Sequence, residues 1–285
     1  MTTAHESVAT HDSSTGQSLT TSAWLDTHFL AMQPEYEAML RWVGIQPGWH
    51  VLDAACGNGS FLPLLTELVG ATGEVSAIDL APENVQVVEA RARQSGWPAS
   101  VVAQTGSILA LPYADHSFDA VWCANTTQYL SNEELALMLK EFRRVVRPGG
   151  LVAIKEYDMT ALQFQPLPPT LIFHLQETLA AVGDRQSHGT LRAIQLPQWL
   201  RAAGLVDLRQ KPTLMVRIPP LREVEKQLFR DYLRFCYLRA QKITLPTGEL
   251  QTWKALADVD SPTHILNHPD FQYRAIQTVF VCCVS

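Results

Sequence analysis

A short stretch near the start of the chain combines a carboxylate with a run of small residues. Val51 and Leu52 are apolar, Asp53 follows them, and residues 54–61 read AACGNGSF. Glycine lets the backbone bend sharply and approach a ligand closely, because no Cβ stands in the way. The first N–H groups of the helix that follows lack intrahelical partners and can donate to a ligand. The stretch therefore predicts a loop that holds a nucleotide cofactor.

A second carboxylate follows at a sequence separation that is typical of nucleotide-binding folds. The apolar run 75–78 ends in Asp79, and an acid about 20 residues after such a loop can accept both hydroxyls of a ribose. The dinucleotide fingerprint would need a third glycine where Leu62 stands. Asp53 would also repel a pyrophosphate and favour a cationic or amine-bearing ligand. These features disfavour an NAD-dependent oxidoreductase.

The order of these motifs resembles a known family. D-x-A-x-G-x-G followed by a strand that ends in Asp79 is similar to motifs I and II of the class I S-adenosylmethionine-dependent methyltransferases, with Ala55 in place of the usual first glycine. The pair Phe118-Asp119 and the run RVVRPGGL of residues 144–151 resemble later markers of that family, especially its quinone-biosynthesis and related small-molecule branch. The resemblance covers about residues 47–154, with a weaker portion around 195–208.

The resemblance implies an α/β fold: a Rossmann-like, doubly wound, mostly parallel seven-stranded sheet with helical lid insertions. Residues 1–21 are rich in Ser and Thr with little to bury, which predicts a disordered tail. Residues 22–285 form one predicted domain, with a core at 45–159, lid insertions at about 160–190 and 221–270, and closing strands at about 205–218 and 276–284. Residues 151–155 are the expected fifth strand, and residues 183–189 read as a polar loop.

The resemblance also implies S-adenosylmethionine as the cofactor. Asp53, Gly57 and Gly59 would hold its amino-acid end, and Asp79 its ribose. Ser107 stands where the family commonly has an acid that accepts from the adenine amino group, so its hydroxyl or the backbone beside Ile108 must serve instead. The full predicted cofactor set is Asp53, Ala55, Gly57, Asn58, Gly59, Asp79, Leu80, Ser107, Ile108, Asn125 and Thr126.

Methyl transfer from a sulfonium needs an aligned acceptor in a dry pocket, and a base helps if the acceptor is a hydroxyl. His188 is the first candidate base, because it lies in the glycine-flanked stretch expected at the pocket mouth. Tyr157, just after the fifth strand, is the second catalytic candidate. The apolar positions of residues 23–43 predict one or two helices, and this leading segment is a candidate cover of the cofactor, although its aromatics also suit plain packing. The predicted acceptor-binding residues are Gln128, Tyr129, Tyr157, His188 and Tyr232.

Bulk composition restricts the partners. The chain has 285 residues and a net charge of −6, which argues against nucleic acid or an anionic membrane as the main partner. Five cysteines without a C-x-x-C pair predict reduced thiols in the cytoplasm and no metal site. The predicted function is methyl transfer to a small, rather apolar or aromatic molecule, with oxygen favoured as the methylated atom. Carbon or nitrogen methylation, a non-methylating cofactor-binding protein, and a homodimer all stay open.

Overall fold

The structure is a computed structural model, and it describes residue 14 and residues 18–285. Most of the tail predicted at residues 1–21 therefore lies outside the described residues. Its last part belongs to the folded domain, because Ser18–Thr20 form a short 3-10 helix, η1, in front of the first α-helix. Within the described residues, no helix is both long and apolar enough to cross a bilayer.

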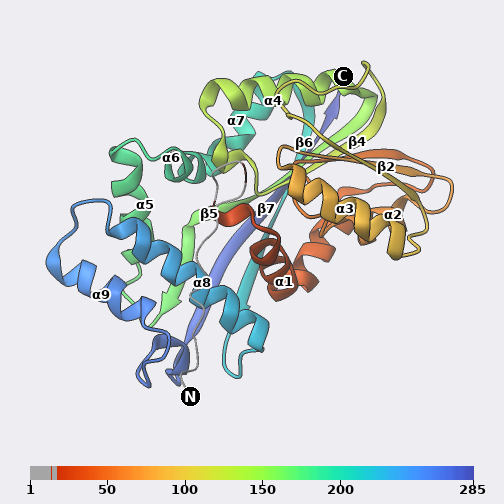
Figure 1. Cartoon of the computed structure of the whole chain (residues 1–285). Helices are drawn as coiled ribbons and strands as arrows, with labels where there is room; N and C mark the ends of the chain where they lie inside the picture. The colour runs from red at the N-terminus through yellow and green to blue at the C-terminus, as the bar shows by residue number, and fades with distance from the viewer. Residues whose placement is uncertain (1–13, 15–17) are drawn as a thin grey trace.

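A seven-stranded sheet forms the centre of the molecule, with the order β3-β2-β1-β4-β5-β7-β6 (Figure 1). The pairs from β3 to β5 are parallel, and β7 is antiparallel to both β5 and β6. This order confirms the predicted Rossmann-like sheet. The strands are β1 (His50–Ala54), β2 (Glu74–Asp79), β3 (Ser100–Thr105), β4 (Phe118–Ala124), β5 (Val146–Gln165), β6 (Leu205–Arg217) and β7 (Gln272–Val284).

Helices cover both faces of the sheet because successive strand residues project to opposite sides. Val51 packs into an apolar cluster with the first two helices, whereas Leu52 packs on the other face against the fourth and seventh. Ser131 begins the fourth helix with the capping box that the sequence shows, since its hydroxyl accepts from the Glu134 N–H. These helices are α1 (Ser22–Val43), α2 (Leu62–Val69), α3 (Pro82–Gln94), α4 (Asn132–Val145) and α7 (Leu196–Ala202).

The fifth strand is much longer than predicted. Instead of ending at residue 155, β5 runs to Gln165 and pairs with β7 along most of that length. Beyond an irregularity after Asp158, Phe164 pairs with Tyr273. The part of the first lid insertion before residue 166 is therefore a strand arm, and it carries aromatic side chains beyond the edge of the parallel sheet.

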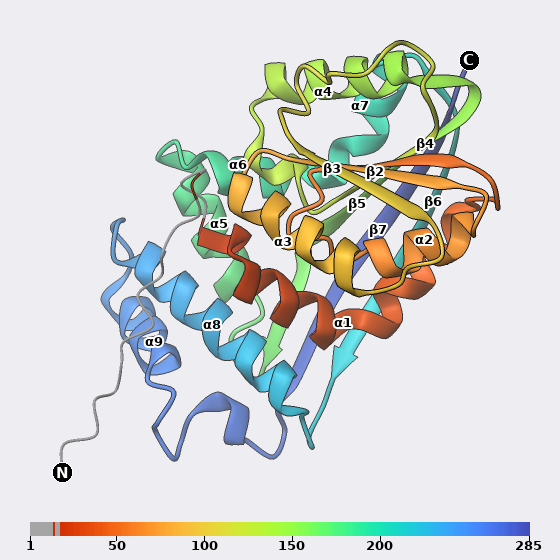
Figure 2. The ribbon, with the colours of Figure 1, turned by 45° about the vertical axis from the view of Figure 1, so that its right-hand side comes forward.

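The remaining lid is helical and sits at one end of the molecule, beside α1 (Figure 2). The predicted polar loop at 183–189 is wrong, because Asp184 caps a helix there by accepting from the Ser187 N–H. Arg217 ties α1 to the lid, since its guanidinium lies 2.6 Å from the Glu35 carboxylate and 2.8 Å from that of Glu225. The lid helices are α5 (Leu171–Ala181), α6 (Arg185–Arg192), α8 (Glu223–Ala240) and α9 (Thr247–Ala257).

Candidate active site

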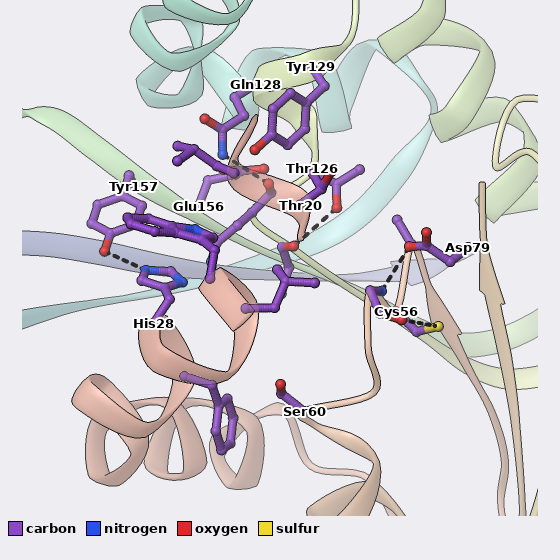
Figure 3. A pocket seen from close by; sticks show the side chains of 18 of the residues that line it. Thr20, His28, Cys56, Ser60, Asp79, Thr126, Gln128, Tyr129, Glu156 and Tyr157 are labelled. Atoms are coloured by element: carbon purple, nitrogen blue, oxygen red, sulfur yellow. Dashed lines mark hydrogen bonds between the residues drawn. The ribbon is translucent and has the colours of Figure 1, made fainter. Parts of the chain in front are cut away.

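One cavity of about 420 Å³ opens at the carboxyl ends of the parallel strands, where ligands bind in open α/β sheets. It brings together most of the residues predicted from the sequence, Glu156 at the ligand-facing end of the fifth strand, and further residues such as His28 that were not predicted to lie there (Figure 3). Gly59 and His188 do not line it. The predicted residues that line it are Asp53, Ala55, Gly57, Asn58, Asp79, Leu80, Ser107, Ile108, Asn125, Thr126, Gln128, Tyr129, Tyr157 and Tyr232.

The glycine-rich loop makes its turn with left-handed backbone conformations. Ala55, Gly57 and Gly59 have φ values of 57°, 54° and 81°. A Cβ on Gly57 would stand 2.8 Å from a methyl of Leu25 in α1, so the glycine also lets that helix lie against the loop. A Cβ on Gly59 would meet Leu62 at 2.7 Å. Gly59 therefore shapes the turn and allows it to pack, while Gly57 faces the cavity.

Asp79 fastens this loop to the next helix. Its carboxylate accepts from the Gly57 N–H at 2.8 Å and from the Ala81 N–H at 2.9 Å, and the Asn84 amide lies 3.3 Å away. Burial raises the pKa of Asp79, and these three donors oppose that rise. Each carboxylate oxygen has two lone pairs, so the group can still accept from a ligand hydroxyl.

Replacing Asp79 with alanine should weaken S-adenosylhomocysteine binding at least about 10-fold, because a charged acceptor of the ribose is removed. The melting temperature should also fall, since the N–H groups of Gly57 and Ala81 lose their partner. Calorimetric titration and a melting curve check both effects. An unchanged affinity would refute the role of Asp79 in cofactor binding.

Asp53 lies one residue before the end of β1 and lines the cavity. Its side chain is 2% exposed, and its Oδ2 atom has no hydrogen-bond partner among the described residues. Burial, and next the charge of Asp79, raise the pKa of Asp53 to about 8. A buried carboxylate oxygen without a donor is costly in free energy. The site therefore suits a ligand that brings a cationic or N–H donor group to Asp53.

Helix α1 closes one side of the cavity, as the sequence had suggested for the leading helix. Trp24, Leu25 and His28 line the cavity from this helix. Both carboxylate oxygens of Asp26 lie 2.8 Å from the Arg91 guanidinium in α3. The Asn58 amide donates to the Ser22 carbonyl at 3.1 Å and to Asp26 at 2.9 Å. In this state the Asn58 side chain therefore holds α1 rather than a ligand.

The polar residues after β4 are engaged with the protein itself. Asn125, with a φ of 56°, accepts from the Lys155 Nζ at 2.8 Å. The Thr126 hydroxyl donates to the Ala124 carbonyl at 3.1 Å. The Gln128 amide donates to the Asn125 carbonyl at 3.0 Å and accepts from Gln186. The structure therefore shows hydrogen bonds of these side chains within the protein, and their roles in ligand binding stay predictions.

Two further predicted residues, Ser107 and Tyr129, also line the cavity. The Ser107 hydroxyl accepts from the Leu109 N–H at 3.1 Å, and Ile108 beside it is buried. Tyr129 is held near the Glu156 carboxylate, and burial followed by that charge raises the pKa of its hydroxyl. Glu156 itself accepts from the Thr127 N–H at 2.6 Å, and burial raises its pKa. Glu156 is thus a carboxyl group in the cavity wall.

The histidine in the cavity is His28 and not His188. His188 is exposed on α6, and its predicted position in a loop at the pocket mouth is wrong, because the segment is a capped helix. The His28 Nε2 atom lies 2.9 Å from the Tyr157 hydroxyl (Figure 3). The same atom lies 3.0 Å from the Tyr36 hydroxyl. Its ring stacks between Trp24 and Tyr157, at centroid distances of 5.8 Å and 5.9 Å. In the sequence, the one indication of this position of His28 is its spacing of four residues from Trp24, which places both side chains on the same face of a helix.

The far half of the cavity is aromatic. The rings of Phe164, Phe229 and Tyr273 pack at centroid distances of 4.7 Å to 5.5 Å. Tyr232 stacks on Phe164, and its buried hydroxyl has no oxygen or nitrogen partner among the described residues. Phe229 and Tyr232 of α8 thus line the cavity, whereas Phe235 of the same helix does not.

Comparison with known proteins points to one class. Residues 51–150 match the family model of a methyltransferase domain. A 2-phytyl-1,4-naphtoquinone methyltransferase of Synechococcus elongatus is 34% identical over 131 residues, which are 44% of this chain and 55% of that protein. A demethylmenaquinone methyltransferase of Bacillus velezensis is 31% identical over 118 residues, 40% of this chain and 48% of the other. The chain thus spans about half the length of these curated relatives.

Solved structures agree on the fold. A Bacillus halodurans protein, provisionally assigned as a methyltransferase, superimposes with a TM-score of 0.56 at 18% identity, over 86% of this chain and 96% of the other. The matched domain, the sheet order and the glycine loop define a class I S-adenosylmethionine-dependent methyltransferase. Residues 51–150 carry that domain, and the two sequence relatives named above are quinone methyltransferases. The predicted family, fold and cofactor are confirmed.

Proposed function

We propose that this protein transfers a methyl group from S-adenosylmethionine to an oxygen atom of a small, rather apolar or aromatic molecule. The observation that carries the cofactor half is Asp53, whose unpartnered buried carboxylate oxygen suits the ammonium group of the cofactor's amino-acid end. Gly57 and Gly59 would hold this amino-acid end together with Asp53, and Asp79 would hold the ribose hydroxyls. When bound, S-adenosylmethionine supplies an electrophilic methyl group on a sulfonium.

The acceptor half of the proposal rests on the aromatic end of the cavity. Phe164, Phe229 and Tyr273 offer a flat apolar surface, and the Tyr157 hydroxyl supplies a polar group near it. Pockets of this kind bind small ligands by burying an apolar body and orienting it with a few polar groups. The relatives' quinone acceptors are ring compounds of that general character, as their names state.

Two alternatives remain distinct from this function. The methylated atom would be carbon if the acceptor is a quinol ring, as the names of the relatives allow, or nitrogen if it is an amine. The second alternative is a protein that binds the cofactor without transferring methyl, and the protein-bound side chains of Asn125, Thr126 and Gln128 favour it slightly. Release of S-adenosylhomocysteine in the presence of a phenol panel would exclude the second alternative.

The cofactor is tested by melting the protein with S-adenosylmethionine, S-adenosylhomocysteine and NAD side by side. A ligand that binds only the native state stabilises it, by about 2.7 kcal/mol at 100 times its Kd, and therefore raises the melting temperature. The first two ligands should raise it and NAD should not. A rise with NAD alone, or with none of the three, would contradict the proposed function.

The cellular compartment is proposed from the state of the cysteines. All five cysteines are free in the structure, and four of them are buried. Unpaired cysteines are usual in a reducing compartment, so we propose the cytoplasm. The proposed partner is the small-molecule acceptor, and dimerisation stays a prediction.

A further inference from the structure

Three side chains meet where the cofactor half of the cavity joins the aromatic half. His28 and Tyr36 come from α1, and Tyr157 comes from β5. All three line the cavity, and both tyrosine hydroxyls lie within 3.0 Å of the same His28 nitrogen. Tyr36 is 1% exposed, so its hydroxyl must be satisfied inside the protein. The direction of each hydrogen bond in this group can be followed from its buried end.

The buried end of the chain is Lys155. Its Nζ donates to the Gln277 Oε1 atom, and the Gln277 Nε2 donates to the Tyr36 hydroxyl oxygen at 2.6 Å. Because the amide uses the oxygen of Tyr36 as acceptor, the Tyr36 proton is left to donate onward. The His28 Nε2, 3.0 Å away, lies within reach of that proton, as does the Tyr157 hydroxyl oxygen. Lys155 therefore orients Gln277, and Gln277 orients Tyr36 toward His28.

The Nε2 atom of His28 can accept a hydrogen bond from only one of the two tyrosine hydroxyls at a time. Burial, and next the charge of Lys155, lower the pKa of His28 to about 3, so the ring is neutral at physiological pH. A neutral imidazole has a single acceptor nitrogen. If Tyr36 donates to it, the Tyr157 proton 2.9 Å away competes for a lone pair already in use. Tyr157 lines the cavity, so its proton can turn to a ligand there.

Lys155 is the cation beside the rings of Tyr36 and Tyr157. Burial lowers the pKa of Lys155 to about 7 and the charge of Glu156 opposes that fall, so the ammonium form, which favours an anion here, is present at and below neutral pH. Lys155 is 0% exposed, and no carboxylate forms an ion pair with it among the residues that the structure describes. Its Nζ lies 3.9 Å from the Tyr36 ring centroid and 5.8 Å from that of Tyr157. Glu156 follows it in the strand and projects to the other side, where the Thr127 N–H holds its carboxylate. Asp53 and Asp79 lie at the cofactor end.

We propose that Tyr157 donates a hydrogen bond to an ionised oxygen of the acceptor, so that the site selects a phenolate or enolate of an aromatic or apolar ring compound. This inference rests on the proposed function and specifies its substrate class. The ring body would lie against Phe164, Phe229 and Tyr273. His28 and Tyr36 are positioning residues, because they act on the acceptor through Tyr157.

Para-nitrophenol is a suitable probe, because its phenolate absorbs visible light and its phenol does not. The wild-type protein is saturated with S-adenosylhomocysteine and titrated with the probe at a pH about one unit below the ionisation midpoint of the free probe. The bound probe should show the phenolate spectrum, with its apparent pKa lowered by about one unit or more. Para-nitroaniline, an uncharged compound of similar shape, should bind about 10-fold more weakly.

The variants separate the direct contact from its positioning. Tyr157→Phe should weaken phenolate binding about 10-fold and return the probe to its phenol form, because the donor is lost. Tyr36→Phe should weaken it about 3-fold or more, because the His28 lone pair becomes free to take the Tyr157 proton. Tyr237→Phe is the matched control and should change nothing, because Tyr237 is a half-buried residue of α8 that does not line the cavity and whose hydroxyl accepts from the Gln241 amide.

Each outcome decides one part of the proposal. Melting curves with S-adenosylhomocysteine are run on every variant, so loss of the fold or of the cofactor is seen separately. If the cofactor product does not bind the wild type, the proposed function itself fails. If it binds, but the probe does not bind, binds as the neutral phenol, or binds Tyr157→Phe equally well, the inference of an anion site is overturned. Failure of Tyr36→Phe alone to weaken binding would overturn the positioning roles.

Discussion

Replacing Asp53 with asparagine should stabilise the ligand-free protein and at the same time remove most of its affinity for S-adenosylhomocysteine. In the folded protein, burial raises the pKa of this carboxyl from 3.8 to about 8. A pKa raised on folding means that the native state binds the proton more tightly than the unfolded state does. The contribution of this carboxyl to the free energy of unfolding is therefore largest below about pH 4, and it is lost as the pH rises toward 8.

The expected size of the stability gain follows from that shift. The full linkage would reach about 5 kcal/mol at pH 8, and relaxation and water entry reduce it, so we expect a gain of about 2 kcal/mol at neutral pH. For a chain of this length, that raises the melting temperature by roughly 4 °C. The advantage of the variant over the wild type should grow between pH 6 and pH 8.

The same substitution removes a charged acceptor for the cofactor's ammonium group. A hydrogen bond to a charged partner contributes about 2 kcal/mol, so affinity for S-adenosylhomocysteine should fall about 30-fold. Asp207→Asn is the matched control: Asp207 is exposed on β6 with a φ of 53°, which asparagine tolerates. A variant that keeps wild-type affinity would refute the role of Asp53, and a variant that is less stable at every pH would refute the account of its burial.

The second large effect is expected at Gly189, where alanine should destabilise the fold. A Cβ at this position would stand 2.2 Å from the Gln128 carbonyl oxygen and 2.8 Å from the Gln128 Cα. These atoms belong to the main chain and cannot turn aside as a side chain would. Overpacking of this kind costs about 3 kcal/mol, which lowers the melting temperature by roughly 6 °C.

The position also matters for the site, because Gln128 and Tyr129 line the cavity. Pushing α6 away from this turn should therefore weaken acceptor binding more than cofactor binding. Gly248→Ala serves as the matched control, since nothing lies within 4 Å of a Cβ there and α9 continues through it. That control should melt at or slightly above the wild-type temperature. Equal melting of the Gly189 variant and the wild type would contradict the close packing of α6 on this turn.

The cofactor half could be predicted from the sequence because its signals are local. Asp53 and the glycines that follow lie within one turn between a strand and a helix, and Asp79 ends the next strand. In a parallel sheet these ends meet at one edge, so residue order alone brings them together. Few other residue types can replace the glycines of the turn or the two carboxylates, so the pattern can be recognised in a single sequence.

The acceptor half could not be predicted because its residues meet across long separations. The extension of β5 to Gln165 is stabilised by β7, more than 100 residues later, and residues 160–165 carry no helix or strand signal that decides between a lid and a strand. His28 lies on a helix with an apolar face, where a histidine usually reads as core. Gly189 suggested a loop in the sequence. In the structure, its lack of a side chain allows α6 to pack against the main chain of Gln128.

Calorimetric titration of the wild-type protein with S-adenosylhomocysteine, from pH 6 to pH 8 and in two buffers of different ionisation enthalpy, tests the central claim most directly. Asp53 must lose its proton to meet the ligand's ammonium group, and its pKa of about 8 places that loss in this range. We predict binding that tightens by about 5- to 10-fold per pH unit, with proton release seen as a buffer-dependent heat that Asp53→Asn abolishes. No binding, or binding with neither pH dependence nor proton release, would contradict the account.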